Sequence, residues 1–334
     1  MLNLLLLQLS NANLDRRSFC AAGITLAVGT AFAEPPAAVR FGMIADLHHS
    51  LMPGAQDRLE SFLEAANRQS PDFLVQLGDL CHGFSPVPTP DQKRFLDTWN
   101  RVRTPKYNVL GNHEMDHSAK APIMGLLEMS RKYYSFDRKK FHFVVLDCMH
   151  VKENGKVLDY VEGSYFHRPA EQINWVDEEQ LEWLAADLRA TSLPTIVFTH
   201  PCINAFWAKG AHETRTNVRE ALEKANAESR RAKVIACFSG HHHADHHSVR
   251  AGVNYFLVNS ASYYWVGEAY GSLAKYRDPL FTFVTIRSDG SLEIEGKDST
   301  FVPPTPTELH HPDAPYVTAS IKARNIRFDG KKNA

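Results

Sequence analysis

Five short apolar runs, each ending in polar residues, recur along this sequence. They are VRFGMIADLHH (39–49), DFLVQLGDLCH (72–82), KYNVLGNHE (106–114), TIVFTHP (195–201) and VIACFSGHHH (234–243). Near-continuous apolar strands are typical of sheets that are buried on both faces. Segments with helical patterning lie between them, at 55–69, 91–102, 118–130, 178–190 and 212–230, and Asp177 is placed to cap the fourth. Alternating strands and helices predict an α/β fold with parallel strands.

The remaining segments extend this plan. Runs at 133–147, 253–266 and 280–296 are rich in aromatic and β-branched residues and predict hairpins or meanders. From residue 303 the sequence is proline-rich and has no periodic pattern, which predicts an extended arm or loose tail over 303–334. We therefore expect one folded domain over 34–302.

Residues 1–33 have the features of an export signal. Arg16-Arg17-Ser18-Phe19 precedes an apolar run from Cys20 to Phe32, and the paired arginines resemble the twin-arginine (Tat) type. This run of about 13 apolar residues is shorter than the roughly 20 that a membrane-spanning helix needs. We predict export to the periplasm or the extracellular space, with no stable membrane insertion once the signal is removed. The cysteines after the signal have no C-x-x-C spacing, so we expect them to be free and buried.

Side chains of the metal-binding type follow each of the five apolar runs. They are Asp46 and His48; Asp79; Asn112, His113 and Glu114; His200; and His241, His242 and His243. In α/β sheets, ligands bind at the edge where the strands have their carboxyl ends. A single histidine after a strand is more often structural than ligating, but together these residues predict a metal site. Carboxylate, imidazole and amide ligands in one site suit Mn, Fe or Zn.

The residue types suit two metal ions about 3.5–4 Å apart. Asp79 has two carboxylate oxygens and can bridge both ions. Residues two apart in an extended segment point the same way, so Asp46 and His48 should face the site together. The same parity predicts that His241 and His243 face the site and that His242 faces away. Two such ions would lower the pKa of a bridging water toward neutrality, and the resulting hydroxide could attack phosphorus in line.

The five blocks resemble the calcineurin-like metallophosphoesterase superfamily, whose pattern is D-x-H, G-D-x-x-D, G-N-H-[ED], H and G-H-x-H. The resemblance spans residues 44–243 and implies a four-layer α/β/β/α sandwich that hydrolyses phosphate esters. It implies one metal held by Asp46, His48, Asp79 and His243, and another held by Asp79, Asn112, His200 and His241. His113 would be the catalytic histidine, as a proton donor or electrostatic stabiliser beside the leaving group. The residues and spacing of the five blocks are most similar to those of the manganese-dependent ADP-ribose/CDP-alcohol diphosphatases and the class III cyclic-nucleotide phosphodiesterases.

One position departs from the family pattern, because His82 stands where an aspartate is expected three residues after Asp79. In the family that acid commonly supports the catalytic histidine. His82 is therefore a candidate to bind His113, phosphate or metal, with an ordinary loop histidine as the alternative. Glu114 is expected to orient a metal ligand. His49 is a weaker candidate for orienting a ligand or for contacting substrate.

We therefore predict a binuclear metal-dependent hydrolase of phosphoester or diphosphate bonds in a small phosphorylated molecule. Two alternatives stay open: a phosphomonoesterase of the acid-phosphatase type, and a non-catalytic metal-dependent binding module. A formal net charge of −1 and the absence of a basic stripe argue against a nucleic-acid partner. The aromatic run Tyr263-Tyr264-Trp265 is either a wall of the substrate pocket or a surface cluster.

Overall fold

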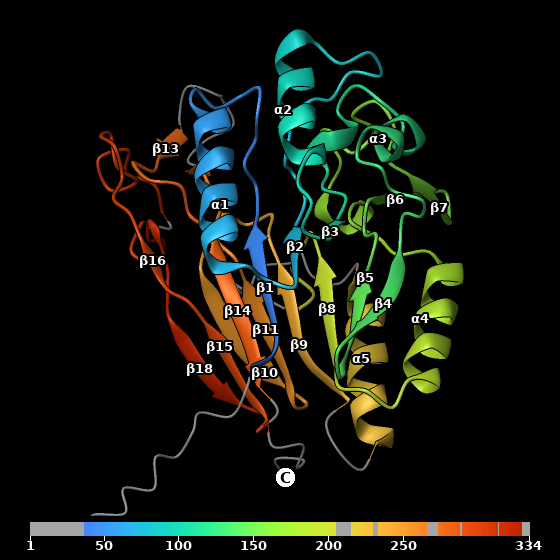
Figure 1. Ribbon diagram of the computed structural model, residues 1–334. Coiled ribbons are helices and arrows are strands. Elements are labelled where there is room, and N and C mark those ends of the chain that lie inside the picture. Colours follow the sequence, from blue (N-terminus) through green and yellow to red (C-terminus); the bar gives the residue numbers. More distant parts are fainter. Residues whose placement is uncertain are drawn as a thin grey trace, which may run out of the picture. The chain divides into compact units, whose positions relative to one another are not determined.

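The computed structural model describes residues 37–204, 215–229, 233–265, 273–287, 289–312 and 314–328. The predicted export signal lies outside these residues. Within them, two six-stranded sheets lie against each other (Figure 1). None of the described helices is long and apolar enough to cross a membrane.

The first sheet carries the three earliest apolar runs. Its strands, in spatial order, are β18 (Arg324–Arg327), β15 (Ser291–Ile294), β14 (Thr282–Arg287), β1 (Ala37–Ile44), β2 (Phe73–Gln76) and β3 (Lys106–Asn108). β1, β2 and β3 are parallel, and β14 pairs antiparallel with β1. The predicted hairpin at 280–296 is confirmed as the β14–β15 pair.

The second sheet carries the other two apolar runs. Its strands are β10 (His246–Arg250), β11 (Val253–Leu257), β9 (Val234–Ser239), β8 (Thr195–Thr199), β5 (Phe141–Val145) and β4 (Tyr134–Arg138). The four central strands are parallel, and β4 and β10 are antiparallel edges. The predicted hairpin at 133–147 is the β4–β5 pair. The run at 253–266 forms no hairpin within itself, because β11 pairs with β9 and β10 whereas β12 (Tyr263–Trp265) pairs with β13 (Leu273–Lys275).

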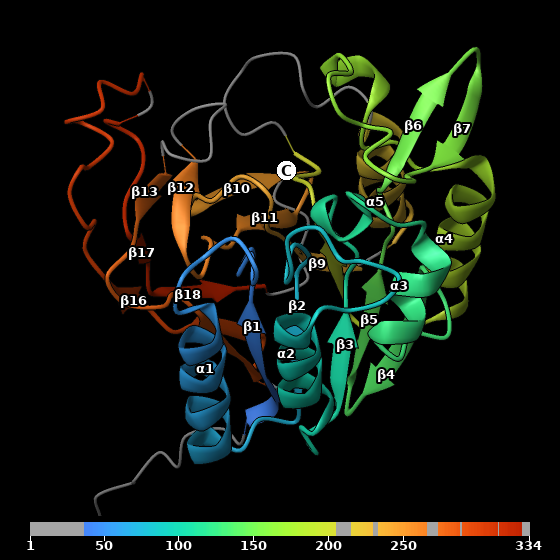
Figure 2. The same ribbon diagram turned by 90° about the horizontal axis from the view of Figure 1, so that it is seen from above.

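Helices cover both outer faces, which confirms the predicted α/β/β/α layers. The α-helices are α1 (Ala55–Gln69), α2 (Pro90–Asn100), α3 (Lys120–Leu126), α4 (Glu178–Ala190) and α5 (Thr216–Glu228). Short 3-10 turns are η1 (His113–Met115) and η2 (Ala170–Gln172), and β6 (His150–Glu153) pairs with β7 (Lys156–Asp159). Figure 2 shows α1 and α2 outside the first sheet and α4 and α5 outside the second. Asp177 caps α4 as predicted, since its side chain accepts from the Gln180 N–H.

The two sheets are joined by an aromatic core. Phe41 of β1 makes edge-to-face contacts with Phe143, Phe198 and Phe238, which lie on β5, β8 and β9, at ring-centroid distances of 5.8, 5.7 and 6.1 Å. All four rings are buried. Each such aromatic pair contributes about 0.5–1.5 kcal/mol beyond the area it buries. The packing fixes the spacing between the strands whose ends carry the predicted ligands. Cys81, Cys148, Cys202 and Cys237 are also buried and free, as predicted.

The C-terminal segment is more ordered than its sequence predicts. β17 (Ser320–Ile321) pairs with β16 (Lys297–Asp298), and β18 extends the first sheet beyond β15. Of the two predicted forms, an extended arm and a loose tail, residues 320–327 therefore match the arm. This arm returns to the first sheet, where β18 pairs antiparallel with β15.

Candidate metal centre

The predicted metal ligands lie in the loops that follow β1, β2, β3, β8 and β9. Asp46, His48, Asp79, His241 and His243 have left-handed backbone conformations, with φ of 50°, 50°, 52°, 68° and 48°. Such conformations cost about 1–3 kcal/mol each and are maintained only where the surroundings fix them. The alternation of side chains along an extended strand therefore does not explain why these side chains point into the site, because their backbones are not extended. Tight turns after the strands aim them inward instead.

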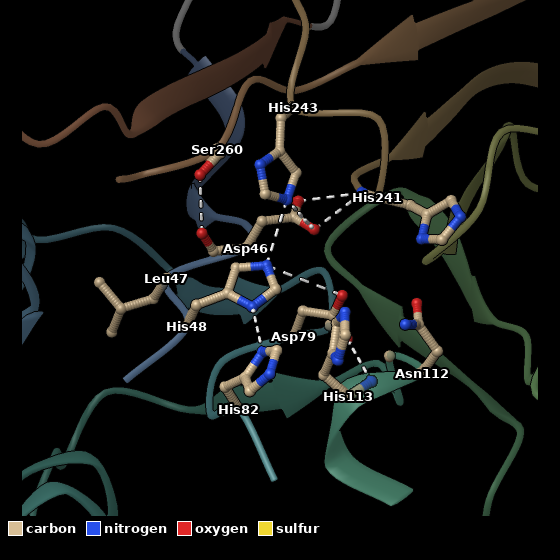
Figure 3. A network of polar contacts seen from close by, with 12 residues as sticks. Asp46, Leu47, His48, Asp79, His82, Asn112, His113, His241, His243 and Ser260 are labelled. Atoms are coloured by element: carbon tan, nitrogen blue, oxygen red, sulfur yellow. Dashed lines mark hydrogen bonds and ion pairs between the residues drawn. The ribbon is translucent and has the colours of Figure 1, made fainter. Parts of the chain in front are cut away.

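Asp46, His48 and His243 form a first group of possible metal ligands, whose ligand atoms all lie within 4.8 Å of one another. His243 Nε2 is 3.1 Å from His48 Nε2 and 3.4 Å from Asp46 Oδ1 (Figure 3). The Tyr263 carbonyl accepts from His243 Nδ1 at 2.8 Å, which directs the Nε2 lone pair into the group. Burial holds the pKa of His48 well below its ordinary value, so that this ring is neutral and able to bind a metal.

Asp79, His200 and His241 form the second group. His200 Nε2 lies 3.1 Å from Asp79 Oδ2 and 3.1 Å from His241 Nδ1. The amide oxygen of Asn112 is also 3.1 Å from this nitrogen. Burial disfavours a charged His200, but the Asp79 carboxylate outweighs burial and raises the pKa of His200 to about 9. The second group therefore accommodates a positive charge beside Asp79.

Asp79 lies between the two groups, as its predicted bridging role requires. Its Oδ2 atom is 3.1 Å from His200 Nε2 and 3.9 Å from His48 Nε2. Among the described residues, the lining of the site contains carboxylate and imidazole donors and no lysine or arginine. Mixed nitrogen and oxygen donors of this kind fit Mn, Fe or Zn. The residues present therefore fit two metal ions, one in each group.

Glu114 and the motif glycines build the loops that carry these ligands. Glu114 Oε2 accepts from the backbone N–H groups of Asp79 at 3.0 Å and Gly111 at 2.7 Å, and Oε1 accepts from that of Leu80 at 2.7 Å. Burial, together with the nearby Asp79, raises the pKa of Glu114 to about 7. A Cβ atom at Gly240 would lie 2.5 Å from Asp46 Oδ2, so only glycine fits there. Glu114 thus holds the backbone that carries Asp79, and its role in orienting a metal ligand stays a prediction.

His113 is held by two residues that are not among the predicted site residues. Its Nδ1 atom lies 2.9 Å from Asp116 Oδ2 and 3.2 Å from the Tyr165 hydroxyl. The Tyr165 hydroxyl also donates to Asp116 Oδ1. Burial opposes protonation of His113, but Asp79 and Asp116 outweigh it and raise its pKa. The spacing of Asp116, three residues after His113 in a 3-10 turn, is a signal that could have identified it, since side chains at i and i+3 there lie one above the other.

Of the two weaker candidates, His82 lies among the site histidines and His49 does not. His48, His82 and His113 form a further group whose ligand atoms all lie within 4.8 Å of one another. His82 stacks on His113, with ring centroids 4.1 Å apart, and its Nδ1 atom lies 3.2 Å from His48 Nδ1. Burial lowers the pKa of His82 to about 4, so this side chain adds bulk and no charge beside His113. His49 is buried against Phe95 of α2, with ring centroids 4.8 Å apart, and is not among the described residues that line the site.

A cavity of about 280 Å³ opens onto both groups. Its lining comprises His48, Asp79, His113, His241, His242, His243, Tyr264 and Trp265. His242 belongs to neither group but lies on the wall, so the prediction that it faces away from the site is wrong. The rings of Trp265 and His113 are inclined by 25° with centroids 6.5 Å apart. Tyr264 and Trp265 therefore form one side of the cavity, as one of the two interpretations of this aromatic run predicts.

Comparisons with known proteins agree with this geometry. Residues 39–245 match the calcineurin-like phosphoesterase family. The manganese-dependent ADP-ribose/CDP-alcohol diphosphatase of Oryza sativa subsp. japonica is 26% identical over 290 residues, which cover 72% of this chain and 89% of that protein.

Two solved structures share the fold. A dimetal phosphatase from Danio rerio superposes with a TM-score of 0.60 at 15% identity, covering 88% of this chain and 100% of that one. GAP50, the anchor in the inner membrane complex of Plasmodium, gives a TM-score of 0.53 at 15% identity, covering 89% and 91%. At these identities the likeness shows the fold alone. Because the family match spans more than half of the sequence and contains every predicted ligand, this chain belongs to the calcineurin-like phosphoesterases and is a phosphoester hydrolase of that family.

Proposed function

We propose that the protein hydrolyses phosphoester or diphosphate bonds in a small molecule with the help of two metal ions. The observation that carries this proposal is the convergence of two ligand groups and His113 on one cavity. Asp46, His48 and His243 would hold one ion, and His200, His241 and Asn112 the other, with Asp79 shared. When bound, the ions would polarise the phosphoryl group and acidify the attacking water. Mn, Fe and Zn are all candidates.

The protein's own residues would manage the leaving group. Asp116 accepts from Nδ1 of His113 and so leaves Nε2 as the atom that can donate a proton. Tyr165 fixes the second oxygen of Asp116. Asp79 and Asp116 outweigh burial and raise the pKa of His113, which favours the protonated ring. His113 would therefore protonate the departing oxygen, a contribution of about 10²–10⁴-fold in rate for general acids.

A nucleoside-linked diphosphate is the substrate class that the cavity wall supports best. Tyr264 and Trp265 offer aromatic surface beside the proposed metal site, and every nucleobase can stack on such a surface. The similarity to a diphosphatase named for ADP-ribose and CDP-alcohols supports the same class. A phosphomonoesterase remains the second candidate, because the ligand groups themselves suit either bond. A non-catalytic binding module is less well supported, since the ligands and His113 are all in place.

The test is a metal-resolved activity screen. Metal-depleted protein is reloaded with Mn, Fe or Zn and assayed with ADP-ribose, 4-nitrophenyl phosphate and bis(4-nitrophenyl) phosphate. We expect Asp79→Asn to weaken metal binding by more than the roughly 100-fold known for residues that only orient ligands, because both groups share this carboxylate. Asp97→Asn on α2, with 65% of its side chain exposed, is the control. No turnover with any metal would refute the hydrolase, and faster turnover of the monoester than of the other two would favour the phosphomonoesterase.

We also propose that residues 1–33 direct export of the protein. The paired arginines, the short apolar run and the small residues before Glu34 support this. Sequencing the amino terminus of protein recovered outside the cytoplasm should find a start close to Glu34. Replacement of Arg16 and Arg17 by lysine should retain the protein inside the cell, and unchanged export of that variant would contradict a twin-arginine signal.

A further inference from the structure

An ion pair joins the C-terminal strand to the loop that carries two of the proposed ligands. Arg324, the first residue of β18, donates from Nη1 to Asp245 Oδ1 at 2.8 Å and from Nη2 to Asp245 Oδ2 at 2.6 Å. The side chains of Arg324 and Asp245 are only 15% and 1% exposed. The Lys322 carbonyl accepts from the same guanidinium at 3.0 Å and helps to orient it. Paired, charged hydrogen bonds of this kind are the strongest and most directional that side chains form.

The ion pair connects the edges of the two sheets. β18 is the outer strand of the first sheet, and Asp245 directly precedes β10, the outer strand of the second. Figure 2 shows both edges on the same side of the sandwich. Asp245 follows His243 by two residues, and His243 has a left-handed backbone with φ of 48°. A conformation of this kind persists only where neighbouring contacts determine it.

A second set of buried contacts runs from the same arm to His243. Asn259 Nδ2 donates to the carbonyl oxygens of Thr318 at 2.8 Å and Ser320 at 3.0 Å. The Tyr276 hydroxyl lies 2.9 Å from Asn259 Oδ1 and 3.4 Å from the His243 carbonyl oxygen. Asn259 and Tyr276 are fully buried. The arm therefore acts on the His243 loop in two places: the ion pair holds Asp245, two residues after His243, and Tyr276 contacts the His243 carbonyl.

We propose that Arg324 is a positioning residue for the metal centre. By fixing Asp245, it holds the loop after β9 in the conformation that aims His243 at Asp46 and His48. Arg324 lies outside residues 39–245, the part of the chain that matches the family. The proposal rests on the proposed metal centre and assigns the C-terminal arm a role in binding the metal.

The test measures metal affinity in the full-length protein. Arg324→Met removes the charge and keeps the length of the side chain. Arg327→Met is the matched control, since Arg327 lies on the same strand and is 67% exposed. Among the described residues, it donates only to the Asp289 carbonyl, at 3.2 Å, and lies 3.9 Å from the Asp289 carboxylate. Metal-depleted protein is titrated with Zn²⁺ or Mn²⁺ against a chromogenic chelator. We expect Arg324→Met to weaken binding by about tenfold or more, within the range known for residues that orient ligands, and Arg327→Met to match the wild type.

Further variants separate positioning from ordinary stabilisation. Arg324→Lys keeps the positive charge but cannot form the two parallel hydrogen bonds to Asp245. This variant should fold and should lose less metal affinity than Arg324→Met. The double variant Asp245→Asn/Arg324→Met leaves no unpaired buried charge and should still bind metal weakly. Wild-type affinity in the folded variants, even with a lower unfolding temperature, would show a merely structural ion pair and overturn the proposal. A wild-type protein that binds no metal would instead refute the metal centre itself.

Discussion

Replacing Asp116 by asparagine should expose how much His113 contributes as a proton donor. Asp116 is buried and accepts from His113 Nδ1 at 2.9 Å, and its carboxylate is one of the groups that raise the pKa of His113. A hydrogen bond to a charged group contributes about 1.5–3 kcal/mol. Because each 1.4 kcal/mol changes a rate about tenfold, Asp116→Asn should lower kcat by about 10- to 150-fold. The loss should be smaller for Tyr165→Phe, which leaves the carboxylate in place.

The assay compares phenyl and 4-nitrophenyl esters of the same phosphate. Phenolate is a poor leaving group and needs a proton from His113, whereas 4-nitrophenolate leaves without one. Asp116→Asn should therefore slow the phenyl ester much more than the 4-nitrophenyl ester, and Asp97→Asn on the exposed face of α2 should affect neither. An equal loss on both esters would indicate damage to the metal site, and an unchanged rate on the phenyl ester would refute the role of Asp116.

Three further predictions concern the buried charges and the cavity wall. Lys120 donates to Asp147 Oδ2 at 2.6 Å and to Asp159 Oδ1 at 2.7 Å. Lys120→Met removes the nearest cation from the fully buried Asp147 carboxylate and should lower the free energy of unfolding in urea by about 3–5 kcal/mol. Lys132 pairs with the half-exposed Asp159, so Lys132→Met should lower the free energy of unfolding by less than about 1 kcal/mol. Equal losses of unfolding free energy in the Lys120 and Lys132 variants would contradict this reasoning. His142 binds Asp137 and Asp187, and these hydrogen bonds outweigh burial and raise its pKa; its stabilisation is therefore complete below about pH 6.5 and is lost as pH rises through the folded-state pKa. His142→Gln should accordingly destabilise the protein more at pH 5.5 than at pH 9, as measured by urea unfolding at both values, and a pH-independent difference would count against it. Trp265→Leu should raise KM for ADP-ribose about tenfold and leave KM for a diphosphate without a base unchanged, whereas a parallel rise for both would show that the ring does not contact the base.

The sequence predicts the helix limits well where hydrophobic periodicity and capping side chains determine them. α1 and α4 begin and end where their amphipathic patterns do, and the Asp177 side chain fixes the start of α4. α3 is shorter than predicted, at Lys120–Leu126 instead of 118–130. Gly125 lowers helix propensity near its end, and Pro122 is tolerated only in a first turn.

The site is predictable to the extent that its residues belong to short motifs. The structure gathers Asp46, His48 and His243 in one group although their strands are far apart in sequence, because the sandwich brings the strand ends together. Tyr165 belongs to no motif and is separated from His113 by 52 residues. Arg324 is likewise separated from Asp245 by 79 residues. Contacts of this range depend on the packed fold, and a single sequence contains no local signal for them.

Each proposed ion would draw its ligands from both sheets. Asp46 and His48 follow β1 of the first sheet, whereas their partner His243 follows β9 of the second. A bound ion would then cross-link the two sheets, between which the aromatic rings of the core are packed. Phe41, buried between the sheets, would help to set how far apart the ligands stand. Core residues that never touch a substrate would thus share in the selection of the metal, since ions of different radius require different ligand separations.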